Sequence, residues 1–170
     1  PYTEEQPRHG HRWLNIHRLE RGQYPRVSTS FLPMMCQHCS DAPCMKANPD
    51  AFERRDDGIV MIIPDKARGK KDIVDSCPYE AIYWNEEKNV PQKCTMCAHL
   101  MDDPAWMAML KMPRCAHGCP TAALKLYDMD PADFQVFARQ QVLLNHLHDL
   151  RPRGHVYFKN HHHPAHHARP

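Results

Sequence analysis

The chain has 170 residues and a net charge of +2, long enough for one compact domain or two small ones. This nearly balanced charge gives none of the strongly basic surface that nucleic-acid binding requires, so we expect no nucleic-acid partner. The longest apolar runs, residues 59–63 and 105–110, are far shorter than the roughly 18 residues of a transmembrane helix. We therefore expect no direct membrane span.

The predicted elements are short, because sixteen prolines interrupt the chain. Apolar runs bounded by turn residues predict strands, and short helical patterns lie between them. A longer helix follows Asp130-Pro131, which is a typical helix start. In chain order we expect a strand at 27–31, a helical turn at 44–47, a strand at 59–63, a helical turn at 70–76, strands at 81–84 and 123–127, a helix at 132–140 and a strand at 156–158. This order predicts the α+β fold class.

Eight cysteines in a polar chain require a chemical explanation. Disulfide frameworks are usual in secreted chains below about 100 residues, and this chain is longer. A C-x2-C pair also directs two thiols toward one point, which suits a metal better than two separate bridges. The candidate metal ligands are Cys36, Cys39, Cys44, Cys77, Cys94, Cys97, Cys115 and Cys119.

The first group of cysteines follows a ferredoxin pattern. Bacterial ferredoxins carry C-x2-C-x2-C-x3-C-P, in which the fourth cysteine ligates the other of two clusters. Here Cys36, Cys39 and Cys44 are the first three ligands, with a longer gap before the third, and the fourth position is Asn48. Cys77 precedes Pro78 and is therefore the cysteine that reaches across from a second motif. These four thiolates form a complete set for one [4Fe–4S] cluster.

The ligands of a neighbouring cluster are missing together. Counting back from Cys77 with the standard spacing leads to Ile73, Lys70 and Ala67. With Asn48, these four positions would all belong to the same cluster under the cross-over rule. The sequence therefore predicts that one [4Fe–4S] site has been lost while its neighbour is kept.

The second group comprises Cys94, Cys97, Cys115 and Cys119, with 17 residues between the second and third and Pro120 after the last. By the same rule, Cys119 would ligate a different cluster from the other three. Two interpretations remain: an upstream cysteine motif is missing from this sequence, or all four share one site. A three-iron cluster on three thiolates is a further alternative.

Zinc is the competing metal. The C-x2-C pairs at Cys36 and Cys94 could form a four-cysteine zinc site. The 54 residues between the pairs are long for such a site, and Cys44 and Cys77 would have no role. An iron–sulfur protein explains more of the pattern.

Three segments resemble the iron–sulfur subunits of the dimethyl sulfoxide reductase family, which include the polysulfide, thiosulfate, tetrathionate and nitrate reductase electron-transfer subunits. The resemblance covers residues 13–158. It implies a non-catalytic subunit that relays electrons between a molybdopterin catalytic subunit and an integral membrane, quinone-reactive subunit. It also implies attachment to a membrane through that partner, on either face. The segments are RGQYPRVSTSFLPMMCQHCSDAPCMKANPDAFERRDDGIVMI, KCTMC with PRCAHGCPTAALKLYD, and PRGHVYFKN.

The resemblance also implies tandem, nested ferredoxin-like units. We expect an inner unit at residues 29–90, an outer unit from residues 1–28 and 91–158, and a His-rich tail at 159–170. In the family, a first motif of four cysteines precedes the stretch that matches His11, so we expect that motif to be missing here. Two other functions stay open, a structural iron–sulfur scaffold and a free ferredoxin. The chain shows no nucleophile–base pair or nucleotide-binding loop, which favours a non-catalytic role.

Overall fold

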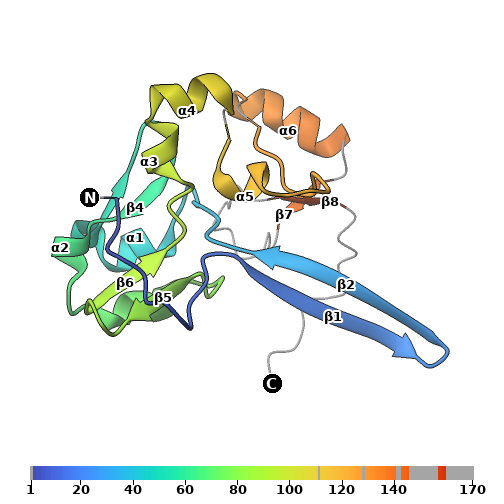
Figure 1. Ribbon diagram of the computed structural model, residues 1–170, viewed down its shortest axis with the longest axis horizontal. Helices are drawn as coiled ribbons and strands as arrows, with labels where there is room; N and C mark the ends of the chain where they lie inside the picture. The colour runs from blue at the N-terminus through green and yellow to red at the C-terminus, as the bar shows by residue number, and fades with distance from the viewer. Residues whose placement is uncertain (1, 111, 128, 141–142, 146–156, 160–170) are drawn as a thin grey trace. The chain divides into compact units, whose positions relative to one another are not determined.

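The computed structural model describes residues 2–110, 112–127, 129–140, 143–145 and 157–159 (Figure 1). The described elements are short helices and two-stranded antiparallel sheets, which confirms the α+β prediction. The chain divides into two compact units. Unit 1 comprises Pro1–Gln37, Pro43–Arg55 and Val60–Thr95, and unit 2 comprises His38–Ala42, Asp56–Ile59 and Met96–Pro170.

Unit 1 contains three antiparallel hairpins and the helical turns between them. The apolar residues around Val60, Ile73 and Val90 are almost completely buried and form its core. This burial explains why such short strands and turns are ordered. The elements are β1 (Asn15–Gln23), β2 (Arg26–Met34), α1 (Pro43–Ala47), the 3-10 turn η1 (Pro49–Ala51), β3 (Phe52–Arg54), β4 (Val60–Ile62), α2 (Pro64–Ala67), the 3-10 turn η2 (Lys71–Ser76), β5 (Ile82–Asn85) and β6 (Val90–Lys93).

The hairpin of β1 and β2 is the longest element of unit 1, with nine residues in each strand. Gly22 lies just before its turn with φ +92°, and a Cβ there would be 2.0 Å from the carbonyl oxygen of Arg26. Only glycine fits this position. The Tyr24–Pro25 peptide in the turn is cis.

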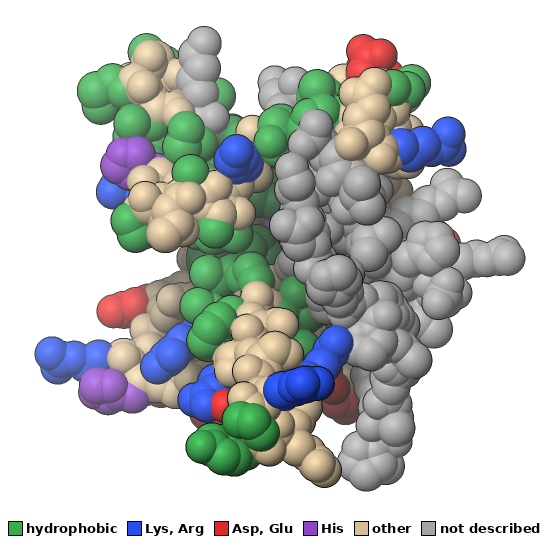
Figure 2. Space-filling model, turned by 90° about the vertical axis from the view of Figure 1, so that its right-hand side faces the viewer, with side chains coloured by type: hydrophobic (Ala, Val, Ile, Leu, Met, Phe, Trp, Pro, Cys, Tyr) green, Lys and Arg blue, Asp and Glu red, His purple; other side chains and the backbone are tan. Residues whose placement is uncertain are grey.

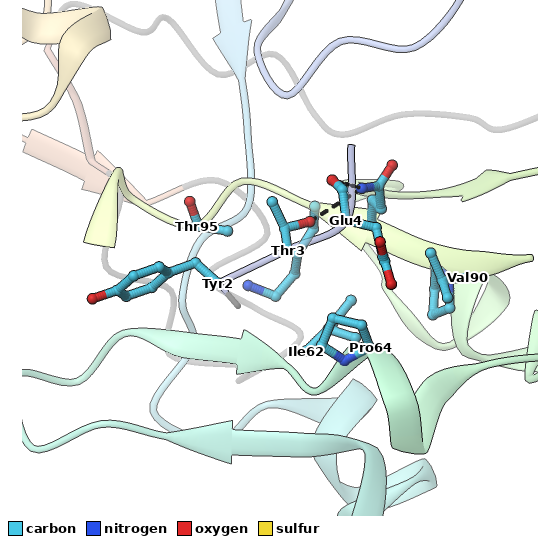
Figure 3. Close-up of a pocket in the computed structure, with 10 residues that line it drawn as sticks. Tyr2, Thr3, Glu4, Ile62, Pro64, Val90 and Thr95 are labelled. Carbon is cyan, nitrogen blue, oxygen red and sulfur yellow. Dashed lines mark hydrogen bonds between the residues drawn. The ribbon is translucent and has the colours of Figure 1, made fainter. Parts of the chain in front are cut away.

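Two buried amide side chains hold the N-terminal segment against the β5–β6 hairpin. Gln92 Nε2 donates to the carbonyl oxygen of Glu4 at 2.6 Å and to Thr3 Oγ1 at 3.1 Å. Asn85 Nδ2 donates to Gln92 Oε1 at 2.8 Å and to the carbonyl oxygen of Glu5 at 2.9 Å. Figure 3 shows the small pocket that results, with Thr3 and Glu4 on one side and residues of α2, β4 and β6 around them. The amides therefore replace the backbone ladder that an added strand would supply.

Unit 2 begins its helical part directly after Cys97. Its elements are α3 (Ala98–Met101), α4 (Pro104–Met109), α5 (Arg114–His117), α6 (Pro131–Gln140), β7 (Leu143–Asn145) and β8 (Tyr157–Lys159). Both α4 and α6 begin with an Asp-Pro pair. Asp103 Oδ1 accepts from the amide of Ala105 at 2.9 Å, and Asp130 Oδ1 accepts from the amide of Ala132 at 2.8 Å. Each aspartate satisfies a first-turn amide, and the proline needs no partner there.

One predicted element is wrong. Residues 123–127 form no strand, and within the described residues no strand pairs with them. The segment begins with two alanines and has no β-branched residue, so alternation alone was not enough to form a ladder. The strand predicted at 156–158 is observed as β8, although residue 156 lies outside the described residues. Within the described residues, no helix has both the length and the apolar character needed to cross a membrane.

We predict that Gln92→Leu lowers the free energy of unfolding by about 2 kcal/mol, because it removes both bonds to the N-terminal segment and one acceptor of Asn85. Urea titration followed by circular dichroism measures the change. The matched control is Glu87→Gln, an exposed residue of the same hairpin. An unchanged unfolding free energy in Gln92→Leu would contradict the role assigned to the amides.

Candidate functional site

Unit 1 brings three of the predicted ligands together. Cys36 follows β2, Cys44 lies in α1, and Cys77 follows η2. Burial raises the pKa of Cys44 to about 11, and the nearby Cys36 and Cys77 raise it further than burial alone. Burial is also the main cause of the raised pKa of Cys77, with a further contribution from Cys36. The three thiols are therefore close enough for their charges to interact.

This environment suits a metal cluster. Without a cation, buried thiols with raised pKa values hold their protons at neutral pH, and a bound metal replaces those protons. Among the described residues, no three His, Cys, Asp or Glu side chains converge as the ligands of a single metal ion do. A [4Fe–4S] cluster places iron and sulfide between its thiolates and needs a wider set. Four thiolates, one for each iron, match that requirement.

Lys93 supplies a positive charge to the same site. It is 3% exposed, and its Nζ donates to the carbonyl oxygen of Val60 and, at 3.1 Å, to that of Cys94. Its charge lowers the pKa values of Cys44 and Cys77, although burial has the larger and opposite effect. Sequence reasoning missed Lys93, because a lysine before a C-x2-C pair carries no sign that it is buried. The signal lay in β6, whose four residues are all buried.

The two C-x2-C loops share an uncommon backbone conformation. In each loop the third residue has positive φ, 44° at His38 and 53° at Met96, and Cys97 follows with 54°. Positive φ is uncommon outside glycine and is found preferentially at ligand-binding sites. Such turns direct successive amides into one concavity, which favours an anionic group such as a cluster with thiolate ligands.

The two Cys-Pro pairs also share one turn. The amide of Glu80 donates to the carbonyl oxygen of Cys77 at 3.1 Å, and the amide of Ala122 donates to that of Cys119 at 3.0 Å. Glu80 and Ala122 have φ values of 52° and 51°. The two cysteine groups therefore repeat the same local geometry at their first pair and at their last cysteine. Neither turn contains glycine, so the sequence gave no sign of the positive φ.

Unit 2 gathers three thiols of the second group. Burial raises the pKa of Cys115, and the neighbouring Cys97 and Cys119 raise it further. The amide of Arg114 donates to Cys97 Sγ at 3.4 Å. The Thr121 hydroxyl, 3.6 Å from Cys119 Sγ, is the main cause of the lowered pKa of Cys119, which is about 7. Hydrogen bonds of this kind to thiolate sulfur are among the factors that set cluster potentials.

Residues 27–129, which include all eight cysteines, match the family of 4Fe-4S dicluster domains. The chain belongs to this family. It is 46% identical over 159 residues to the small subunit of pyrogallol hydroxytransferase from Pelobacter acidigallici, which covers 94% of this chain and 57% of that relative. It is 33% identical over 129 residues to the thiosulfate reductase electron transfer subunit of Salmonella typhi, 75% of this chain and 65% of the relative. The chain thus spans little more than half of the first relative.

The family confirms several predictions. The chain is a ferredoxin-like iron–sulfur protein, its cofactors are [4Fe–4S] clusters, and its relatives include iron–sulfur subunits of dimethyl sulfoxide, thiosulfate and tetrathionate reductases. None of the eight cysteines forms a disulfide. The individual ligand sets stay predictions. Cys39 belongs to unit 2 and Cys94 to unit 1, so each predicted set of four includes one thiol from the other unit.

The positions of the predicted lost cluster are occupied by packed side chains. Ala67 and Ile73 are completely buried. Asn48 Nδ2 donates to Asp72 Oδ2 at 3.1 Å, which ties the end of α1 to η2. The family match does not test the loss itself, which stays a prediction.

We predict that Lys93→Met lowers the reduction potential of the dicluster domain's first cluster by on the order of 50 mV, because the reduced cluster loses a nearby positive charge. A redox titration followed by EPR measures the potential. Lys93→Arg keeps the charge and is expected to retain most of the potential. Lys88→Met removes a cation at the turn of the same hairpin and is the control. Equal potentials in wild type and Lys93→Met would contradict the assignment.

Proposed function

We propose that this chain is the electron-transfer iron–sulfur subunit of a larger oxidoreductase complex and exchanges single electrons with a molybdopterin-type catalytic subunit. The observation that carries the proposal is the repeated cysteine geometry within a segment that matches the dicluster family. The chain's own groups bind and tune clusters, and the predicted ligand sets account for all eight cysteines. The relatives named as electron-transfer and beta subunits support the same role.

In this proposal the first [4Fe–4S] cluster binds to Cys36, Cys39, Cys44 and Cys77. The second group, Cys94, Cys97, Cys115 and Cys119, holds one or more further [4Fe–4S] or [3Fe–4S] clusters. A bound cluster supplies a one-electron redox centre. The protein buries the thiolates, directs backbone amides toward them and adds the charge of Lys93. Burial excludes water from the centre, and the cation favours its reduced state.

The predicted loss of a neighbouring cluster gives this subunit a shortened or rerouted electron path. The buried Ile73 and Ala67 support the loss, since a chain that had to wrap a cluster would carry thiols at these positions. The inner and outer ferredoxin-like units predicted from the motifs belong to the same proposal.

The electron partner beyond the catalytic subunit has two candidates. The reductase relatives favour an integral membrane, quinone-reactive subunit, as the family resemblance implies. The hydroxytransferase relative favours a second candidate, a complex without such an outlet. Moving a hydroxyl group between two molecules oxidises one and reduces the other, so no net electrons leave. Identity of 46% over 94% of the chain is the specific observation behind this candidate.

The first test is the iron and acid-labile sulfide content after anaerobic purification, with EPR of the reduced sample. We expect about seven to twelve irons per chain, which means that both cysteine groups hold clusters. About four irons would mean that only the first site fills. Clusters that cannot be reduced would favour the structural scaffold, and zinc without sulfide would overturn the proposal.

The second test separates the two electron partners. If a quinone-reactive subunit is the partner, the purified complex oxidises a soluble quinol analogue and its EPR-visible clusters become reduced. If the complex transfers hydroxyl groups, quinol leaves the clusters oxidised. Dithionite is the control reductant in both cases. Reduction by quinol would therefore exclude the outlet-free candidate.

A further inference from the structure

The β1–β2 hairpin is a long ribbon with little support from the rest of unit 1 (Figure 1). Every residue of β1 and the first six of β2 are exposed, and only Leu32 and Met34 at its base are buried. The sheet has no third strand among the described residues. Two-stranded hairpins are marginally stable in water unless another surface covers one face.

The strand register divides the ribbon into two different faces. Residues directly opposite in an antiparallel pair lie on the same face. Ile16 is opposite Pro33, Arg18 opposite Phe31, and Gly22 opposite Val27, so these pairs share one face. On this apolar face Ile16 is 64% exposed, Phe31 66% and Val27 53%. Its charged pair, Arg18 and Glu20, is joined by a salt bridge.

The opposite face is polar toward the tip and apolar only at its base. It carries His17, Leu19, Arg21 and Arg26, and at the base the buried Leu32 and Met34. This polar face is therefore the one whose base packs on unit 1, while the apolar face stays open. Large apolar side chains on an exposed sheet are a liability for aggregation unless a partner covers them.

The charge of the ribbon favours one kind of partner. Between Asn15 and Met34 it carries three arginines (Arg18, Arg21, Arg26) and one glutamate (Glu20), a net charge of +2 that equals that of the whole chain. Figure 2 looks from the side toward which the ribbon points, and green apolar side chains lie there beside blue basic ones, with less red. Two copies of such a ribbon would bring like charges together. An apolar surface bordered by carboxylates complements it.

We propose that the β1–β2 ribbon is a docking arm that lies in an apolar groove bordered by carboxylates on the catalytic subunit of the complex. The proposal rests on the proposed function, which supplies that subunit. Ile16, Val27 and Phe31 enter the groove, and the arginines toward the tip meet its acidic border. The exposed strand edges give the groove backbone groups with which to pair.

The test uses the cluster-loaded chain and its separately purified catalytic subunit, with Kd measured by calorimetry. We expect Ile16→Thr/Phe31→Thr to weaken binding by about 30-fold or more, because two large apolar contacts at one interface are lost. The control is Leu19→Thr, the same kind of change on the polar face, which should stay within about twofold. An unchanged Kd in the double variant overturns the proposal.

A second pair of measurements keeps the test decisive. Iron, sulfide and reduction potential are determined for each variant, so that loss of the clusters is distinguished from loss of docking. Ile16→Thr/Val27→Thr, which keeps Phe31, repeats the test if the first variant does not fold. Arg26→Gln should slow association and weaken its salt dependence. If the wild-type chain alone dimerises and the double variant does not, a second copy covers the arm and the proposal is wrong.

Clusters that cannot be reduced, together with weakened binding in the double variant, would remove the electron-transfer function and leave the arm. Reducible clusters with unchanged binding would do the reverse. The two failures therefore give different results.

Discussion

Buried thiols that lie close together cannot all be ionised unless positive charge lies among them. Burial and mutual repulsion raise the pKa of Cys44 to about 11, and Cys77 is raised in the same direction. A chain that places three such groups in one unit has a core that favours a cationic occupant over protons. The fold of unit 1 follows from this constraint, because short hairpins and turns suffice when a cluster supplies part of the core.

The same constraint explains where the backbone is unusual. Residues in the left-handed region are costly, yet His38 and Met96 adopt it inside the two C-x2-C loops. Each turn aims amide dipoles where a cluster's negative charge would lie. Lys93 contributes a full charge from within β6, and the carbonyl oxygens of Val60 and Cys94 hold its ammonium group in place. Charge, dipoles and burial thus act on one site from different elements.

The sequence predicted the chemistry better than the architecture. Cysteine spacing reports on clusters because each iron requires a thiolate and the loops between ligands have narrow length limits. No comparable rule governs the strands. Nothing in residues 15–23 distinguished an exposed strand from a loop, and β1 was missed, whereas the predicted strand at 123–127 had alternation but no neighbour to pair with. Lys93 and the left-handed turns were invisible, because burial and backbone dihedrals depend on tertiary contacts.

The helical segment between Cys97 and Cys115 starts and ends at predicted ligands. Asp103 caps its second helix, Trp106 Nε1 donates to the carbonyl oxygen of Met112 at 2.9 Å, and the Arg114 guanidinium lies 4.4 Å from the Trp106 ring centroid. The segment is therefore closed by its own contacts. Lengthening a closed loop costs only a logarithmic amount of chain entropy. Evolution can thus enlarge or reshape this excursion to suit new neighbours while the metal-binding loops at its two ends keep their geometry.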